Sequence, residues 1–145
     1  AGGAKLLRRD FGERMGNLAA SGEYHWFAPS FLRYAGPRQV ADLPVDAHTL
    51  IAMAAPRALF IGAGNFNEDG WVDPRGSWEA ARAASPVWRL YGQEGLAGDA
   101  YPAINETRDA GRIAFRQHDG GHTNGPNWPA FLAFAERVWE LGGRR

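Results

Sequence analysis

Residues 58–61 have the sequence ALFI, a short and nearly continuous apolar run of the kind found in strands that are buried on both faces of a parallel sheet. A polar loop rich in turn-forming residues follows over residues 62–74, and an Ala-rich helix is predicted over residues 76–84. The pattern then repeats, because residues 112–118 (RIAFRQH) predict a strand and residues 129–142 a closing helix. Strand, loop and helix occurring twice in succession indicate an α/β fold with parallel strands and crossover helices.

The other parts of the chain carry weaker signals. Residues 1–45 are rich in Gly and aromatic residues, and we expect loops there with one short helix near residues 11–20. Asp46 is a predicted N-cap for a helix that ends before Pro56. Residues 87–91 (VWRLY) fit either a short strand or an extension of the preceding helix.

Two of the predicted helices have an apolar stripe, which normally faces a core. In the helix after Asp46 the apolar face consists of Leu50, Ile51, Met53 and Ala54. In the closing helix it consists of Phe131, Leu132, Phe134, Ala135, Val138 and Trp139.

Length and composition limit the fold and its partners. A chain of 145 residues, 45% of them hydrophobic, is long enough for one domain with a core and too short for two. Sixteen basic and sixteen acidic residues cancel, and no apolar run reaches about eighteen residues, so neither nucleic acid nor a membrane is an expected partner. Without cysteines, disulfides and a Cys nucleophile are excluded. Because the chain starts at Ala1 without an initiator Met or a signal-peptide pattern, we expect residues 1–145 to be a single partial domain.

The loops that follow the two predicted strands carry the best candidates for catalysis. Asp69 lies in the first loop, over residues 65–74, and His122 in the second, over residues 118–126. In parallel sheets, ligands bind beyond the carboxyl ends of the strands, where both loops would lie. An acid after one strand and a His after the next is the later part of the order Ser, acid, His of α/β-hydrolases. Such a His is a general base, and the acid holds its tautomer and stabilises the imidazolium.

The same residues also have plainer interpretations. A His in a Gly-rich loop is more often a turn residue than a catalyst, and an Asp in a turn is usually a cap. The pair Gly120 and Gly121 would let the backbone turn sharply before His122. His118 is predicted to be buried and hydrogen-bonded rather than catalytic.

No nucleophile is found in the sequence. None of the four serines lies in a Gly-x-Ser-x-Gly elbow, and Ser77 and Ser85 resemble helix-terminal residues. The chain is therefore either one part of an enzyme or has no hydrolase activity of its own. A zinc site at His118 and His122 is disfavoured because two glycines separate them and no His-Glu-x-x-His motif follows. We predict no metal and no other cofactor.

A set of short motifs runs along nearly the whole chain. They are residues 1–6 (AGGAKL), 8–13 (RRDFGE), 25–27 (HWF), 43–48 (LPVDAH), 55–57 (APR), 69–74 (DGWVDP), 86–92 (PVWRLYG) and 120–122 (GGH). In this order they resemble the glucuronoyl esterases, carbohydrate esterase family fifteen. The resemblance implies the C-terminal portion of an α/β-hydrolase fold. It also implies a metal-free Ser-His-acid triad that cleaves the ester between a glucuronic acid on xylan and a lignin alcohol.

The resemblance assigns roles to individual residues. It implies that His122 is the catalytic base and that Asp69 occupies the acid position after the penultimate strand. It further implies that Glu13 and Trp71 bind the sugar. The nucleophile would lie in a Ser-Arg-x-Gly-Lys-like elbow N-terminal to Ala1, and a Glu just before Ala1 is a rival for the acid. The implied enzyme is secreted or periplasmic, and its partner is a glucuronate-containing plant cell-wall polysaccharide or its esters.

Several alternatives stay open. The chain could belong to an acetyl-xylan or other carbohydrate esterase on the same fold, or be a non-catalytic carbohydrate-binding remnant. It could also be a fragment without a function of its own, with an unpaired sheet edge and poorly covered apolar surface. Trp71 could pack under its loop, and Glu13 could form a solvated ion pair with Arg9 or Arg14. Arg9 and its neighbour Arg8 could instead bind a substrate carboxylate.

Overall fold

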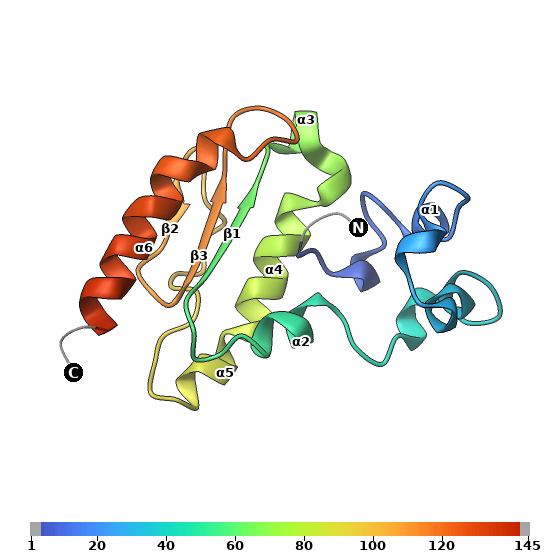
Figure 1. The fold of residues 1–145 in the computed structure, drawn as a ribbon, viewed down its shortest axis with the longest axis horizontal. Helices are drawn as coiled ribbons and strands as arrows, with labels where there is room; N and C mark the ends of the chain where they lie inside the picture. Colours follow the sequence, from blue (N-terminus) through green and yellow to red (C-terminus); the bar gives the residue numbers. More distant parts are fainter. Residues whose placement is uncertain (1–3, 143–145) are drawn as a thin grey trace.

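The computed structural model describes residues 4–142 and contains a three-stranded sheet with helices on both faces (Figure 1). Its strands are β1 (Leu59–Ala63), β2 (Thr107–Arg108) and β3 (Ile113–Gln117), in the order β1-β3-β2. β1 and β3 pair in parallel, as the repeated strand–loop–helix pattern predicts. The predicted α/β class is therefore confirmed.

The short strand β2 departs from the prediction. It pairs with β3 in the antiparallel direction, with Thr107 opposite Arg116, so the sheet is mixed rather than purely parallel. Residues 109–112 are all that joins β2 to β3. A parallel crossover needs about a dozen residues or more, so a connection this short allows only the antiparallel direction.

Most predicted helices are present, although their ends differ. The α-helices are α1 (Met15–Leu18), α2 (Ala47–Ala52), α3 (Phe66–Asp69), α4 (Pro74–Ala84), α5 (Pro86–Arg89) and α6 (Trp128–Gly142). Turns of 3-10 helix are η1 (Leu7–Arg9), η2 (Tyr24–Trp26), η3 (Pro29–Ala35), η4 (Val40–Asp42), η5 (Gly70–Val72) and η6 (Gly125–Asn127). The helix expected near residues 11–20 is only the short α1, and residues 87–91 start in helix α5 rather than forming a strand. Within residues 4–142 no helix is long and apolar enough to span a bilayer.

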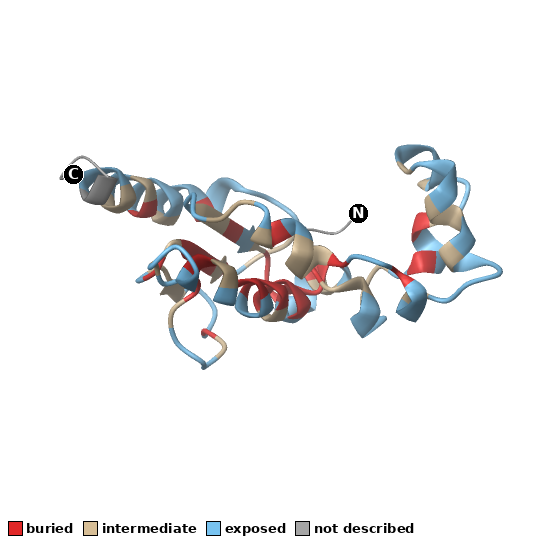
Figure 2. Cartoon of the chain, turned by 90° about the horizontal axis from the view of Figure 1, so that it is seen from below, coloured by how far each residue is buried: buried red, intermediate tan, exposed pale blue. Residues whose placement is uncertain are grey.

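Helices α4 and α6 lie on opposite faces of the sheet (Figures 1 and 2). On one face, Trp78 of α4 stands edge-on to Phe115 of β3, with ring centroids 5.5 Å apart. On the other, Phe134 of α6 lies 6.0 Å from Phe60 of β1. Buried residues concentrate around α4 rather than α6 in Figure 2, so the main core lies between α4 and the sheet.

The apolar stripes of α2 and α6 are less buried than the sequence predicts. Asp46 caps α2 as expected, accepting a hydrogen bond from the Ala47 N–H. Of the apolar residues of this helix, Ile51 is buried but Leu50 is exposed, as is Met53 just after it. In α6, Phe134 is buried whereas Leu132 and Trp139 are exposed. Neither stripe is fully covered by the described residues.

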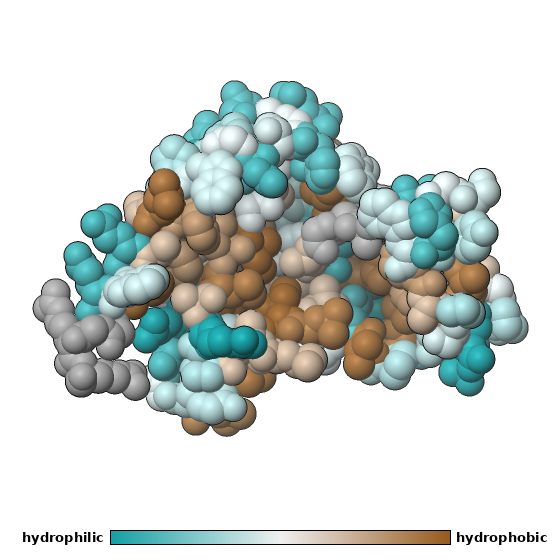
Figure 3. All heavy atoms as spheres, in the orientation of Figure 1, coloured by the Kyte–Doolittle hydropathy of each residue, from teal (hydrophilic) through white to brown (hydrophobic). Residues whose placement is uncertain are grey.

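Strand β1 is also less buried than a strand with two covered faces. Ile61 is the one buried residue among its five. β1 pairs with β3 along one edge, and within residues 4–142 no strand pairs with its other edge. Figure 3 shows apolar side chains gathered over β1 and α2 on this face. The described residues thus form a sheet with an open edge and apolar surface beside it, a combination that proteins normally cover.

We predict that the stability of this fold depends on the α4 side of the sheet. Ile113 of β3 is fully buried in the main core, whereas Leu90 is 83% exposed. Ile113→Ala should lower the free energy of unfolding by about 3 kcal/mol, because it removes buried methylene groups and leaves a cavity. Leu90→Ala should change it by less than about 0.5 kcal/mol. Urea unfolding followed by tryptophan fluorescence measures both, and similar losses in the two variants would contradict this position of the core.

Candidate active site

The register of β1 and β3 places the ends of both strands at one edge of the sheet. Ala63 and Gln117, their last residues, lie opposite each other. α3 follows β1 and the loop of His122 follows β3, and both lie at the top of Figure 1. The two polar loops therefore meet where the sequence pattern predicts.

Asp69 and His122 form a hydrogen-bonded pair at this edge. The Nδ1 atom of His122 lies 3.1 Å from Oδ1 of Asp69. Asp69 is 2% exposed, whereas the His122 side chain is 66% exposed. An ionised carboxylate can only accept hydrogen bonds, so the ring proton of a neutral His122 lies on Nδ1 and the lone pair on Nε2. This arrangement holds a base in the tautomer needed to take a proton from a nucleophile.

Asp69 is held by Gly64 of its own loop, and Gly64 in turn packs closely against the loop of His122. The other carboxylate oxygen of Asp69 accepts a hydrogen bond from the Gly64 N–H at 3.1 Å. A Cβ at Gly64 would lie 2.6 Å from the carbonyl oxygens of both Gly120 and Gly121, so only Gly allows the loops to approach this closely.

Asn65 joins the two loops, although the sequence analysis did not single it out. Its side-chain oxygen caps α3 by accepting hydrogen bonds from the N–H groups of Asn67 and Glu68. Its amide nitrogen donates to Asp119 at 3.1 Å, and its backbone N–H donates to the Gly120 carbonyl at 2.9 Å. An Asn directly after a strand was a visible capping signal.

The loop before His122 has the sharp turn expected of its glycines. Gly120 has a φ of 122°, a conformation that L side chains rarely adopt. His118 is fully buried, and its Nε2 lies 3.1 Å from the Gly121 carbonyl oxygen. The prediction of a buried, hydrogen-bonded His118 is confirmed.

Trp71 lies beside the pair and is partly exposed. Its ring centroid is 4.7 Å from that of His122, and the residue is 42% exposed. A shallow hollow next to it is lined by Gly12, Glu13, Asn17, Ala20, Glu23 and Trp71. The two residues that the family resemblance assigns to the sugar, Glu13 and Trp71, therefore share one depression.

The backbones on both sides of this hollow are in direct contact. The Glu13 N–H donates to the Trp71 carbonyl oxygen at 2.8 Å. Gly12 has a φ of 66°, and a Cβ there would lie 2.4 Å from the same oxygen. The turn before Glu13 thus depends on the absence of a side chain at Gly12.

The arginines near Glu13 have other partners than those proposed from the sequence. Arg9 pairs with Asp73 at 2.8 Å and with Glu79 at 3.0 Å. The guanidinium of Arg8 donates to the Leu43 carbonyl oxygen. A carboxylate-binding role for Arg8 and Arg9 is therefore not supported, because both point to groups of the protein itself.

Neither a nucleophile nor a metal site completes the pair within residues 4–142. In this range the His122 ring has no hydrogen bond to a serine. Ser77 lies buried in the first turn of α4, and the Ser85 hydroxyl bonds the Ala81 carbonyl and the Leu96 N–H. The same residues contain no group of three or more His, Asp or Glu side chains that could hold a metal ion.

Comparison with known proteins identifies the family. The model of the family described as "Glucuronyl esterase, fungi" matches residues 5–92, more than half of the chain. The chain belongs to the glucuronyl esterase family. The resemblance seen in the short motifs is confirmed, and the matched range includes Glu13, Asp69 and Trp71.

Relatives of this glucuronyl esterase chain agree in sequence and structure. A CE15 glucuronoyl esterase from Teredinibacter turnerae T7901 is 52% identical with a TM-score of 0.90, over 96% of this chain and 33% of its own. A glucuronoyl esterase from Solibacter usitatus is 33% identical with a TM-score of 0.82, over 95% of this chain and 34% of its own. Carbohydrate esterase MZ0003, from an unknown prokaryotic organism, is 35% identical over 93% of this chain and 30% of its own length. The fold is part of an α/β-hydrolase domain, and the chain spans about a third of the length of these relatives.

The close backbone contact in this glucuronyl esterase chain predicts opposite effects for two Gly substitutions. Gly12→Ala should destabilise the fold by about 1–3 kcal/mol, because Gly12 has a positive φ and no room for a Cβ. Gly16→Ala, in helix α1 with nothing within 4 Å of its Cβ, should stabilise by about 0.4–1 kcal/mol. Thermal unfolding of both variants is the measurement. A Gly12→Ala variant as stable as the parent would show that the Glu13 turn does not depend on the close contact between Gly12 and the Trp71 carbonyl oxygen.

Proposed function

We propose that this chain carries the base and the acid of a serine esterase that hydrolyses glucuronoyl esters, those joining xylan glucuronic acid to lignin alcohols. The observation that supports this most strongly is the 3.1 Å contact between His122 and the buried Asp69, beside an exposed Trp, at the ligand-bearing edge of the sheet. The names of the relatives, among them a 4-O-methyl-glucuronoyl methylesterase of Hypocrea jecorina (37% identical over 49% of this chain and 14% of its own length), support the substrate class. The serine nucleophile is supplied from outside residues 4–142.

In the proposed mechanism, His122 transfers one proton in each of the two half-reactions. Nε2 takes the proton of the serine hydroxyl as the serine attacks the ester carbonyl, and backbone N–H groups stabilise the oxyanion. The imidazolium then gives this proton to the leaving alcohol. In the second half-reaction Nε2 takes a proton from water as the water attacks the acyl-enzyme, and His122 returns that proton to the serine oxygen, which frees the carboxyl group of the xylan-bound glucuronic acid. Asp69 stabilises the imidazolium in both steps, and its burial makes that interaction stronger than it would be in water.

Sugar recognition is proposed to use the hollow beside the catalytic pair. Trp71 offers a flat, partly exposed ring on which a pyranose can stack. The Glu13 carboxylate can accept hydrogen bonds from sugar hydroxyls, and hydrogen bonds to charged groups are the stronger ones. Plant cell-wall xylan lies outside the cell that degrades it, so we also propose that the protein is secreted or periplasmic.

The proposal is tested on the complete enzyme. By this we mean the chain joined to an upstream segment that supplies the serine, either its own or that of the Teredinibacter turnerae relative. It should hydrolyse benzyl D-glucuronate, and His122→Ala should lower kcat by about 10⁴-fold or more because the base is lost. His25→Ala, at an exposed site on the N-terminal segment, is the matched control. Unchanged turnover in His122→Ala would refute the assignment. Sugar binding without hydrolysis would favour the carbohydrate-binding alternative. Faster hydrolysis of acetylated xylan than of the glucuronate ester would favour the acetyl-xylan esterase.

A second prediction concerns the triad acid, for which an upstream carboxylate is the rival. If Asp69 holds the tautomer, Asp69→Asn should lower kcat by about 10⁴-fold with little change in KM, because an amide can donate to Nδ1 and favour the wrong tautomer. Asp119→Asn is the control, since Asp119 lies on the same loop edge but bonds Asn65 rather than His122. A loss of less than about tenfold in Asp69→Asn would assign the acid to the rival carboxylate.

A further inference from the structure

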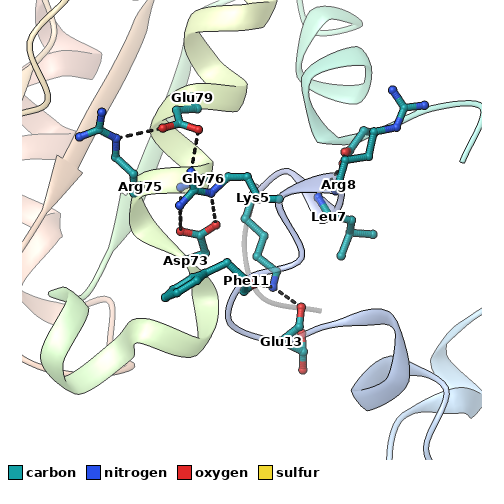
Figure 4. A network of polar contacts seen from close by, with 11 residues as sticks. Lys5, Leu7, Arg8, Phe11, Glu13, Asp73, Arg75, Gly76 and Glu79 are labelled. Carbon is teal, nitrogen blue, oxygen red and sulfur yellow. Dashed lines mark hydrogen bonds and ion pairs between the residues drawn. The ribbon is translucent and has the colours of Figure 1, made fainter. Parts of the chain in front are cut away.

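We propose that Arg9 is a positioning residue of the sugar subsite, which holds the Glu13 turn against the Trp71 loop with the help of Lys5. The proposal rests on the function proposed above and extends it to residues that do not touch the substrate. Figure 4 shows the network concerned, with Lys5 bonded to the turn of Glu13 and with Asp73 and Glu79 at the start of α4. Arg9 connects the N-terminal segment to these two carboxylates.

The two walls of the hollow come from segments that are far apart in the sequence. Glu13 belongs to the N-terminal segment and Trp71 to the turn η5, which follows β1. One backbone hydrogen bond, from the Glu13 N–H to the Trp71 carbonyl, joins them directly. A single hydrogen bond contributes little net stability, so further contacts are needed to hold the two walls in register.

Lys5 fixes the shape of the turn that carries Glu13. It is almost fully buried, and its Nζ donates to the carbonyl oxygens of Phe11 at 2.7 Å and of Glu13. Burial lowers the pKa of Lys5, and the negative charges of Asp73, Glu13 and Asp10 oppose that shift. A buried ammonium group that bonds two carbonyls of one turn closes that turn without reaching solvent.

Arg9 attaches the same segment to the Trp71 loop. Its Nε donates to Oδ2 of Asp73 at 2.8 Å, and a second guanidinium nitrogen donates to Glu79 at 3.0 Å. Asp73 is fully buried two residues after Trp71, and its Oδ1 caps α4 by accepting from the Gly76 N–H at 2.9 Å. The Arg9 guanidinium therefore binds the carboxylate of Asp73, the residue at which the Trp71 turn ends and α4 is capped.

The packing around this ion pair leaves little freedom. A Cβ at Gly76 would lie 2.1 Å from Oδ2 of Asp73 and 3.1 Å from Cδ of Arg9. Phe11 stacks on Phe66 of α3, with ring centroids 5.7 Å apart, which adds a second contact between the two segments. Loss of the Arg9 contact should therefore shift Glu13 relative to Trp71 rather than unfold the sheet.

The test compares Arg9→Gln with Arg75→Gln in the complete enzyme. Arg75 pairs with the same Glu79 at 3.0 Å, and both residues lie on α4, which makes Arg75 a matched control. For benzyl D-glucuronate, Arg9→Gln should raise KM about tenfold and change kcat less than about twofold, because ground-state sugar binding is weakened. Turnover of p-nitrophenyl acetate, an ester without a sugar, should stay unchanged, as should both substrates in Arg75→Gln.

Two further variants guard against misfolding, since Arg9→Gln leaves the Asp73 charge buried and unpaired. Arg9→Lys keeps that charge partnered and should raise KM less than Arg9→Gln. Lys5→Met keeps the length of the side chain, leaves no buried charge and should raise KM for the glucuronate ester alone.

The proposal is overturned if the folded variants keep the parent KM, or if they lose activity equally on both esters. The proposed function itself fails in a different way. In that case the parent enzyme hydrolyses p-nitrophenyl acetate and leaves the glucuronate ester intact.

Discussion

The parallel pairing of β1 with β3 is the constraint on which the rest of the structure depends. Two neighbouring strands that run in the same direction require a crossover, and the chain supplies it with α4, whose Trp78 packs on Phe115 in the main core. The same pairing brings both carboxyl ends to one edge of the sheet. Asp69 and His122 are 53 residues apart in the sequence, and they meet at 3.1 Å because each lies in the loop beyond the carboxyl end of its strand.

The loop after β1 places two carboxylates in different surroundings. Asp69 is buried next to the Gly-rich loop of β3, where it accepts from Gly64 and holds His122. Asp73 is buried at the start of α4, where it caps the helix and pairs with Arg9. Trp71 lies between these two residues in the sequence and is partly exposed, whereas the side chains of Asp69 and Asp73 are both buried. A short loop can thus present an aromatic ring to solvent in a fixed position.

The open edge of β1 and the exposure of His122 have one explanation in the proposed enzyme, which is contact with a further segment. The relatives of known structure are about three times as long as the part they share with this chain. In the proposed enzyme, a base that faces outward from this edge can meet a serine carried by another segment. The apolar side chains over β1 and α2 in Figure 3 lie on the face that such a segment would cover.

The sequence by itself determined the α/β class, the order of the main strands and helices, the cap at Asp46 and the pairing of the Asp69 and His122 loops. These features depend on hydrophobic period, turn residues and strand ends, which are local properties of the chain. Only the tertiary structure decided that residues 107–108 pair with β3, that Leu50 is exposed and that Arg9 pairs with Asp73. Each of these depends on which surfaces meet in space, and Arg9 and Asp73 are 64 residues apart with no local pattern to link them. A buried carboxylate needs a nearby cation, and Arg9 is placed to provide it only after the chain has folded. The order of residues in the sequence does not show that Asp73 is buried or that Arg9 lies beside it.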